Sequence, residues 1–257
     1  GNYAVATAQQ NITVTTPVPV ISSATTATAT VGTGFNYTIA ASSTPTSFTA
    51  TGLPTGLSLV AATGVISGTP SVGGVFNVAL TATNSGGTSV PVNLVLTVNA
   101  GPTITTQPQP QTMGVGGTVT LFVVATGTPA PTYQWKKAGS AIAGATNASF
   151  TISSVALSDA EAYTVTVTNL VASVTSTAAV LTVNSGPAIT TQPIDQTVTA
   201  GANVTFSAVA TGTPAPTYQW RKGGVAISGA TSASYSLTAV QSSAAGTYDV
   251  VVTNTVG

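Results

Sequence analysis

Apolar residues in this chain alternate with threonine and serine in short runs that glycine or proline interrupts. Because successive side chains of a β-strand point to opposite faces, a period of two predicts strands with one buried face. No run has the three-to-four-residue apolar spacing of a helix, and β-branched residues dominate. The pattern predicts an all-β fold, with strands in the first part of the chain at residues 26–31, 35–40, 47–51, 75–83 and 92–98.

The second part of the chain contains a tandem repeat. The sequence ATGTPAPTYQW at residues 125–135 recurs unchanged at residues 210–220, which is 85 positions later. A repeat of that length with strand-like flanks indicates a duplicated domain. Each copy carries one tryptophan, Trp135 or Trp220, just after a turn rich in proline. We predict β-sandwiches in tandem, with these two indoles filling their cores.

The repeat period and the turn residues divide the 257-residue chain into three modules. Module 1 spans residues 17–100, module 2 spans residues 101–185, and module 3 spans residues 186–257. Module 3 contains no counterpart of the last strand that residues 174–183 are expected to form in module 2.

The segments outside the predicted sandwiches are short. Residues 99–102 and 184–187 are linkers that each contain a proline, so we expect a semi-rigid linear array. Residues 1–16 are interpreted as end strands of a preceding domain or as a strand donated to another chain. In that segment Gly1-Asn2-Tyr3-Ala4-Val5 is similar to residues 246–250, and a second strand-like run consists of Asn11, Ile12, Thr13, Val14 and Thr15.

Two glycine-rich stretches of module 1 carry a family resemblance. TGLPTGLS at residues 51–58, followed by TGVISGTP at residues 63–70, resembles the putative-immunoglobulin, dystroglycan-cadherin-like modules of large bacterial surface proteins. In that family an acidic residue often precedes the Ser-Gly-Gly that follows the next long strand. Here that position is Asn84, which argues against the calcium binding that the cadherin comparison would imply.

Modules 2 and 3 resemble the I-set immunoglobulin-like domains that occur in long arrays in bacterial exported proteins. The resemblance depends on a Gln-Pro opening, a tryptophan followed by lysine or arginine, and a tyrosine in the sixth strand. It implies that each tryptophan lies beside the two positions that a disulfide usually joins. Those positions are Val123 with Val165, and Ala208 with Val250, so an aliphatic pair is expected to replace each bridge.

The sixth-strand tyrosines, Tyr163 and Tyr248, match the family's tyrosine corner, in which the hydroxyl bonds to backbone across a loop. Asp159 fits the family's acid that caps this loop, and its counterpart in module 3 is Ala244. We therefore expect structural roles for these residues.

Charge and composition exclude several function classes. Charged residues are 3% of the chain, the net charge is zero, and the first charged side chain is Lys136. Nucleic-acid binding needs clustered lysine or arginine, which the sequence lacks. No run of about 18 apolar residues predicts a membrane span. The absence of cysteine rules out disulfides and thiolate metal sites.

The sequence offers no set of catalytic or metal-binding residues, so we expect neither an enzyme nor a cofactor. Histidine and cysteine are absent, which removes the usual general bases and most metal ligands. The carboxylates are Asp159, Glu161, Asp195 and Asp249, and we interpret them as solvated surface groups. A Lys–Asn isopeptide cross-link needs a lysine and a buried acid, which module 1 does not contain.

These observations predict a structural protein, extracellular or at the cell surface of a bacterium. Its modules would act as spacers in a stalk, fibre or filament, and its partners would be copies of itself or adjacent immunoglobulin-like domains. The alternative is an adhesive or carbohydrate-binding appendage of a larger exported protein, with Tyr133 and Tyr218 as the available aromatic residues. Any glycan or cell-surface ligand, and any glycosylation of the abundant threonine and serine, stays open.

Overall fold

The computed structural model describes residue 1, residue 3, residue 5 and residues 7–256. These residues form β-strands and two short 3-10 turns, which confirms the all-β prediction. The chain divides into two compact units, and the boundary between them passes through module 2. The first unit comprises Gly1–Thr105, Ala125–Thr132 and Val167–Val174, and the second comprises Thr106–Val124, Tyr133–Thr166 and Thr175–Gly257.

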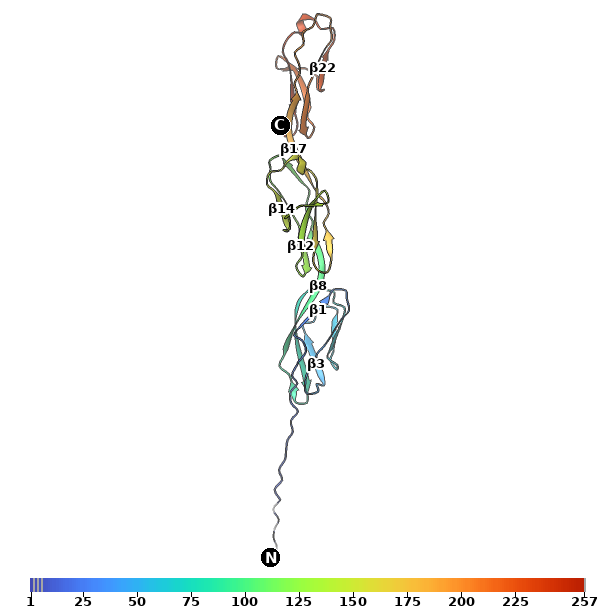
Figure 1. The fold of residues 1–257 in the computed structure, drawn as a ribbon, viewed down its shortest axis with the longest axis vertical. Helices are drawn as coiled ribbons and strands as arrows, with labels where there is room; N and C mark the ends of the chain where they lie inside the picture. Colours follow the sequence, from blue (N-terminus) through green and yellow to red (C-terminus); the bar gives the residue numbers. More distant parts are fainter. Residues whose placement is uncertain (2, 4, 6, 257) are drawn as a thin grey trace. The chain divides into compact units, whose positions relative to one another are not determined.

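Module 1 is a sandwich of two sheets, drawn in blue to green in Figure 1. One sheet has the order β1-β8-β6-β3, with β7 beside β6, and the other has the order β2-β5-β4. The core between them includes Phe48, Ile66, Leu80 and Leu96, which are all buried. The strands are β1 (Thr26–Thr30), β2 (Phe35–Thr38), β3 (Ser47–Thr51), β4 (Leu57–Val60), β5 (Val65–Gly68), β6 (Gly74–Asn84), β7 (Gly87–Thr88) and β8 (Val92–Thr106).

Strands β4 and β5 occupy the two glycine-rich motifs of module 1. The alternation of apolar residues does not single them out, because each has only four residues and lies between turn residues, β4 between Gly56 and Gly64 and β5 between Gly64 and Pro70. They pair antiparallel with each other, and β5 also pairs with β2. Gly56 has φ +96°, and its carbonyl oxygen accepts the Thr69 N–H at 3.0 Å. The two motifs are therefore hydrogen-bonded to each other.

The segment expected to link modules 1 and 2 is part of a continuous strand. β8 pairs with β1 and β6 of module 1 up to Asn99, then continues to Thr106 and pairs with β11 (Val124–Thr128). β17 (Ala179–Thr191) does the same, since it pairs with β15 (Ala162–Thr168) and later with β19 (Val209–Thr213). The prolines at 102 and 187 interrupted the sequence pattern, but proline is tolerated in edge strands.

Module 2 departs from the expected strands in two places. The last strand, expected at residues 174–183, is instead two strands, Ser173–Thr175 and Ala179–Thr191, and between them the Ser176 hydroxyl accepts the Val165 N–H at 3.0 Å. The I-set resemblance places the second strand at residues 119–125, but the chain divides at Val123 into β10 (Val119–Phe122) and β11, which lie in different sheets. β10 pairs with β14 (Ser149–Ile152). The remaining elements are β9 (Gln111–Gly114), β12 (Thr132–Lys137), β13 (Ser140–Ala141), the turn η1 (Leu157–Asp159), β15, β16 (Ser173–Thr175) and β17.

Module 3 repeats this plan in the described residues up to Val256, with fewer paired strands. β20 (Thr217–Lys222) lies between β21 (Val225–Ala226) and β23 (Tyr248–Thr253). β18 (Val204–Ser207) pairs with β22 (Ser234–Leu237), and η2 (Ser242–Ala244) precedes β23. Residues 196–199, the counterparts of β9, belong to no strand.

The strand-like run from Asn11 to Thr15 forms no strand within the described residues. Its apolar side chains are exposed, Ile12 at 90% and Val14 at 89%. The similarity of Gly1-Asn2-Tyr3-Ala4-Val5 to β23 involves Asn2 and Ala4, which lie outside the described residues.

Candidate functional site

Each tryptophan of the repeat is completely buried. The Trp135 indole Nε1 donates a hydrogen bond to the Asn147 carbonyl oxygen at 3.0 Å, and Trp220 donates to that of Ser232 at 2.9 Å. Because the one polar atom of each indole has a partner, burial of the indole leaves no hydrogen-bond donor unpaired.

The positions of the missing disulfide bridge are filled by aliphatic side chains. Val123 and Val165 are both buried in module 2. In module 3 Ala208 is buried, whereas Val250 is only partly buried. Ala208 is smaller than its counterpart Val123, and a larger side chain packs beside it, because Phe206 occupies the position of Leu121 in module 2. The Phe206 ring lies 6.1 Å from that of Trp220 and 5.0 Å from that of Tyr248, measured between centroids.

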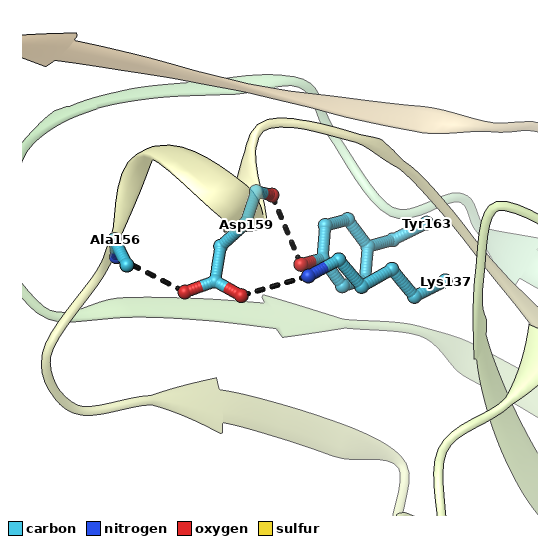
Figure 2. Close-up of polar contacts among 4 residues, drawn as sticks. All are labelled: Lys137, Ala156, Asp159 and Tyr163. Carbon is cyan, nitrogen blue, oxygen red and sulfur yellow. Dashed lines mark hydrogen bonds and ion pairs between the residues drawn. The ribbon is translucent and has the colours of Figure 1, made fainter.

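A group of polar contacts in module 2 joins β12 to the turn η1 (Figure 2). The Tyr163 hydroxyl donates to the Asp159 carbonyl oxygen at 3.0 Å. The Asp159 carboxylate accepts the Ala156 N–H at 3.0 Å and the Lys137 ammonium at 2.8 Å. One aspartate thus holds the turn through its backbone and its side chain together.

This arrangement shifts three pKa values. The hydrogen bond from Lys137, and then that from the Ala156 N–H, lower the pKa of Asp159. The same bond to Asp159 raises the pKa of Lys137, and burial raises the pKa of Tyr163. All three shifts favour the protonation states that these groups already have at neutral pH.

Module 3 keeps the tyrosine contact but changes its surroundings. The Tyr248 hydroxyl donates to the Ala244 carbonyl oxygen at 2.9 Å. Lys222 has no aspartate to bind at residue 244 and donates instead to the Ser243 carbonyl oxygen at 2.7 Å. Its Nζ also lies 5.6 Å from the centre of the Tyr248 ring.

Ion pairs engage two of the four carboxylates that the sequence analysis interpreted as solvated. Asp159 binds Lys137, and Asp249 binds Arg221 through both the guanidinium Nε, at 3.0 Å, and Nη2. Glu161 and Asp195 are exposed. Within the described residues no group of three or more acidic side chains could hold a metal ion. None of the helical segments described here has the length and hydropathy to span a membrane.

A different set of side chains repeats in all three modules: the asparagine at the end of the sixth strand or just after it. Asn169 Nδ2 donates to the carbonyl oxygens of Ala100, at 2.7 Å, and Pro129, at 3.0 Å. Its Oδ1 accepts the Val171 N–H at 3.0 Å. We call this arrangement, one carboxamide holding the incoming strand, a proline-containing turn and its own loop, the asparagine clamp.

Module 3 has the same clamp 85 residues later. Asn254 Nδ2 donates to the carbonyl oxygens of Ser185, at 2.8 Å, and Pro214, at 2.9 Å. Its Oδ1 accepts the Val256 N–H at 2.9 Å. Both prolines, Pro129 and Pro214, follow cis peptide bonds.

Module 1 has a clamp as well, although its sequence shares little with that of modules 2 and 3. Asn84 Nδ2 donates to the carbonyl oxygens of Pro17, at 2.9 Å, and Ser43, at 2.7 Å, and its Oδ1 accepts the Gly86 N–H at 2.8 Å. The sequence analysis considered Asn84 only as a substitute for a calcium-binding acid. Its amide donors already occupy the two carbonyl oxygens that face it.

The surface of module 3 has a groove next to β23. It has a volume of about 430 Å³ and contains exposed parts of apolar side chains from both sheets. The apolar lining includes Val198, Val204, Phe206, Leu237, Val240 and Tyr248. In module 2 the counterparts of three of them, Leu121, Val155 and Tyr163, are fully buried.

Comparison with known proteins gives matches over most of the chain. Residues 101–169 and 186–254 each match the immunoglobulin domain family, and residues 17–99 match the family described as putative Ig domain. Among curated proteins, endoglucanase C of Cellulomonas fimi is 35% identical over 170 residues, which is 62% of this chain and 15% of the endoglucanase. Roundabout homolog 1 of Rattus norvegicus is 32% identical over 152 residues, which is 52% of this chain and 9% of that protein.

Among solved structures, the I-band fragment I67–I69 from titin has a TM-score of 0.66 at 18% identity. The alignment covers 92% of this chain and 94% of the titin fragment, and at that identity it shows the fold alone. The chain therefore spans a small part of each curated relative and nearly the whole of a three-domain fragment.

Proposed function

Because this chain belongs to the immunoglobulin domain family, we propose that it is a structural protein whose modules act as spacers outside the cell. The tandem β-sandwich organisation is shared with other multi-domain immunoglobulin proteins, among them Roundabout homolog 1 and titin. Within the described residues no group of three or more acidic side chains could hold a metal ion, and the Tyr163 hydroxyl and the Asn169 carboxamide bond to backbone groups of the same fold.

The observation that carries the proposal is the hydrogen bonding of the segment that joins one module to the next. The segment between modules 1 and 2 is not a loop but the middle of β8, hydrogen-bonded to a sheet on either side. The clamp from Asn169 then fixes the Ala100 carbonyl oxygen. A connection made of paired strand and side-chain hydrogen bonds suits a protein that transmits position or tension, because a flexible linker would absorb both.

The composition supports the same role. With 3% charged residues and zero net charge, the surface offers little electrostatic repulsion to neighbouring copies. Close packing of copies in a fibre or filament, extracellular or at a cell surface, is consistent with that surface.

Small-angle scattering of the purified chain tests the spacer role. We expect a particle whose maximum dimension falls when Gly-Gly-Ser is inserted between Ala100 and Gly101, since the insertion interrupts β8. The control is the same insertion between Gly223 and Gly224, in an exposed turn of module 3. Equal maximum dimensions for the two insertion variants and the unmodified chain would contradict the proposal.

A second candidate function is an appendage module of a larger exported protein that binds carbohydrate. The observation in its favour is the 35% identity to 15% of endoglucanase C. The observation against it is the small number of exposed aromatic side chains, on whose faces sugar rings usually stack. Among the described residues only Tyr3 and Phe122 are largely exposed. Retention of the purified chain on insoluble cellulose or xylan, released by soluble fragments of the same polymer, would favour the appendage.

A further inference from the structure

We propose that the open edge of β14 in module 2 pairs with β14 of a second copy, so that two chains associate side by side. The inference rests on the proposed structural role and deepens it, because it supplies a contact through which copies pack in a fibre. This contact lies wholly within module 2, whose flanking strands β8 and β17 continue into the modules on either side.

One edge of β14 is hydrogen-bonded to β10. The two strands are antiparallel, in a register that places Leu121 opposite Phe150. Two positions further in the same register, the Val123 N–H donates to the Ala148 carbonyl oxygen at 2.9 Å. Because bonded and non-bonded pairs alternate in an antiparallel ladder, Phe150 also directs its backbone N–H and C=O toward β10.

The backbone groups of Ser149 and Thr151 therefore point away from β10, to the other edge of β14. Within the described residues no strand pairs with that edge, and both residues are exposed. A strand edge whose N–H and C=O groups have no strand beside them is a template for pairing with another chain.

The sequence of β14 does not block such pairing. Exposed edges of natural sheets usually carry a charged side chain, a proline or a bulge. Residues 147–154, NASFTISS, include neither a charged residue nor a proline, and the register with β10 is regular. The net charge of zero also leaves little long-range repulsion between two copies.

A groove of about 460 Å³ lies beside this edge. Its apolar lining includes Ile142, Phe150 and Ile152, which are partly buried. Lys137 and Asp159 also line the groove, but they bind each other (Figure 2). The groove therefore favours an apolar side chain placed next to Phe150 over an ionic ligand.

A second β14 has the features that this edge and groove require. In an antiparallel pair related by a twofold axis, Ser149 lies opposite Thr151 of the second copy, and the two residues exchange both N–H···O bonds. Phe150 then lies opposite Phe150 of the second copy in a non-bonded pair, where Cβ atoms are about 5 Å apart. Each ring covers the exposed part of the other, beside the groove.

Module 3 has the same edge on β22, which pairs with β18 in the corresponding register. The Ala208 N–H donates to the Ala233 carbonyl oxygen at 2.9 Å, so the backbone groups of Ser234 and Ser236 point to the open edge. A matching strand is thus present twice in every copy of this chain, which favours a second copy as the occupant. Pairing of one four-residue strand covers less than the about 1,200 Å² of a stable interface, so we expect weak association that the second edge strengthens.

Sedimentation equilibrium of the 257-residue chain at up to about 1 mM tests the inference. We expect reversible association of the unmodified chain. The double variant Ser149→Lys, Ser234→Lys should associate at least about tenfold more weakly, because it places a charge on each open edge. The matched control is Thr112→Lys, Thr197→Lys, which adds the same charge at exposed positions away from β14 and β22.

A proline tests the backbone contact itself. In the Ser234→Lys background, which confines pairing to β14, Thr151→Pro removes an N–H that points to the open edge and makes no bond to β10. Thr151→Ala is the control, since both variants lose the hydroxyl bond to Thr120 at 2.8 Å and only the proline removes the N–H. We expect weaker association for the proline variant, and a thermal transition shows that module 2 stays folded.

Hydrogen exchange locates the contact in the unmodified chain. The amides of Ser149 and Thr151 are expected to exchange more slowly as the protein concentration rises, because pairing supplies each with an acceptor. Association that leaves both exchange rates unchanged overturns the assignment to β14.

A chain that stays monomeric over the whole concentration range leaves the edge to a peptide of another protein and overturns self-pairing. Equal association of the two double-lysine variants overturns it as well. The spacer role is judged separately, from the scattering dimension of the Ser149→Lys, Ser234→Lys variant as a monomer. The two proposals can therefore fail independently.

Discussion

The side-chain nitrogen of Asn169 lies 2.7 Å from the carbonyl oxygen of Ala100, a residue 69 positions earlier in the chain. The Asn254 nitrogen is 2.8 Å from the Ser185 carbonyl oxygen at the same separation. A carboxamide provides two donors and one acceptor oxygen, and the clamp uses all of these features. Aspartate has the same shape without donors, so asparagine is chemically required at these positions.

Asn169→Asp is expected to destabilise the clamp around Ala100 by about 1–3 kcal/mol, because two carbonyl oxygens lose their donors and face a negative charge. Chemical denaturation, together with hydrogen exchange of amides in β8 and β11, measures the effect. The control is Asn147→Asp, since Asn147 is exposed and contributes only its backbone carbonyl to Trp135. Equal stability of the two variants would show that the clamp has no energetic role.

The buried indoles give a second prediction. Trp220→Ala is expected to cost about 3–5 kcal/mol and to unfold module 3, since a completely buried aromatic side chain and its hydrogen bond to Ser232 are lost. Trp135→Ala is the matched variant for module 2. Calorimetry should show one transition lost or lowered in each, and the remaining indole reports on the other module by fluorescence. A melting profile that does not change would contradict a core role for the indole.

The sequence predicts a strand correctly wherever the strand buries one face, because apolar and polar residues then alternate along it. β1, β3 and β6 of module 1 follow the predicted ranges to within a residue or two, since each buries alternate side chains. The continuity of β8 was not accessible, because Gly101 and Pro102 are turn formers in isolation. Pairing with β11, a long-range contact, overrides that local preference.

The asparagine clamp was missed for a related reason. Its two acceptors are backbone carbonyl oxygens, which leave no mark on residue identity, and one of them lies 69 residues away. A signal did exist: Asn84, Asn169 and Asn254 recur at the repeat period of 85, even though module 1 shares little other sequence with modules 2 and 3. The groove could not be located from sequence either, because it depends on which side chains of module 3 stay uncovered.

Exchange of two core residues tests the packing of module 3 against that of module 2. Ala208→Val alone is expected to destabilise by about 1–3 kcal/mol, because Phe206 already fills the neighbouring volume. Adding Phe206→Leu recreates the Leu121 and Val123 pair of module 2 and should recover part of the loss. A double-mutant cycle in denaturant measures the coupling. Additive effects would mean that the two positions pack independently.

The ion pair of module 2 predicts an acid dependence of stability. The Lys137 hydrogen bond lowers the pKa of Asp159 in the folded state, so the folded chain binds fewer protons at this site than the unfolded chain. The contribution is therefore complete above the unfolded-state pKa of about 3.9 and is lost as the pH falls through the folded-state pKa below it.

At its maximum this contribution is at most about 1 kcal/mol, because the pair is partly exposed and solvent screens it. Asp159→Asn should lower the stability of module 2 at pH 7 and remove most of the loss that this site causes as the pH falls below about 4. Asp195→Asn is the control, since Asp195 is exposed and no ion pair forms at its carboxylate in the described structure. Urea denaturation at several pH values, followed by Trp135 fluorescence in a Trp220→Phe background, measures module 2 selectively. If Asp159→Asn and the unmodified carboxylate gave parallel stability curves across that range, the bond to Lys137 would not stabilise the fold.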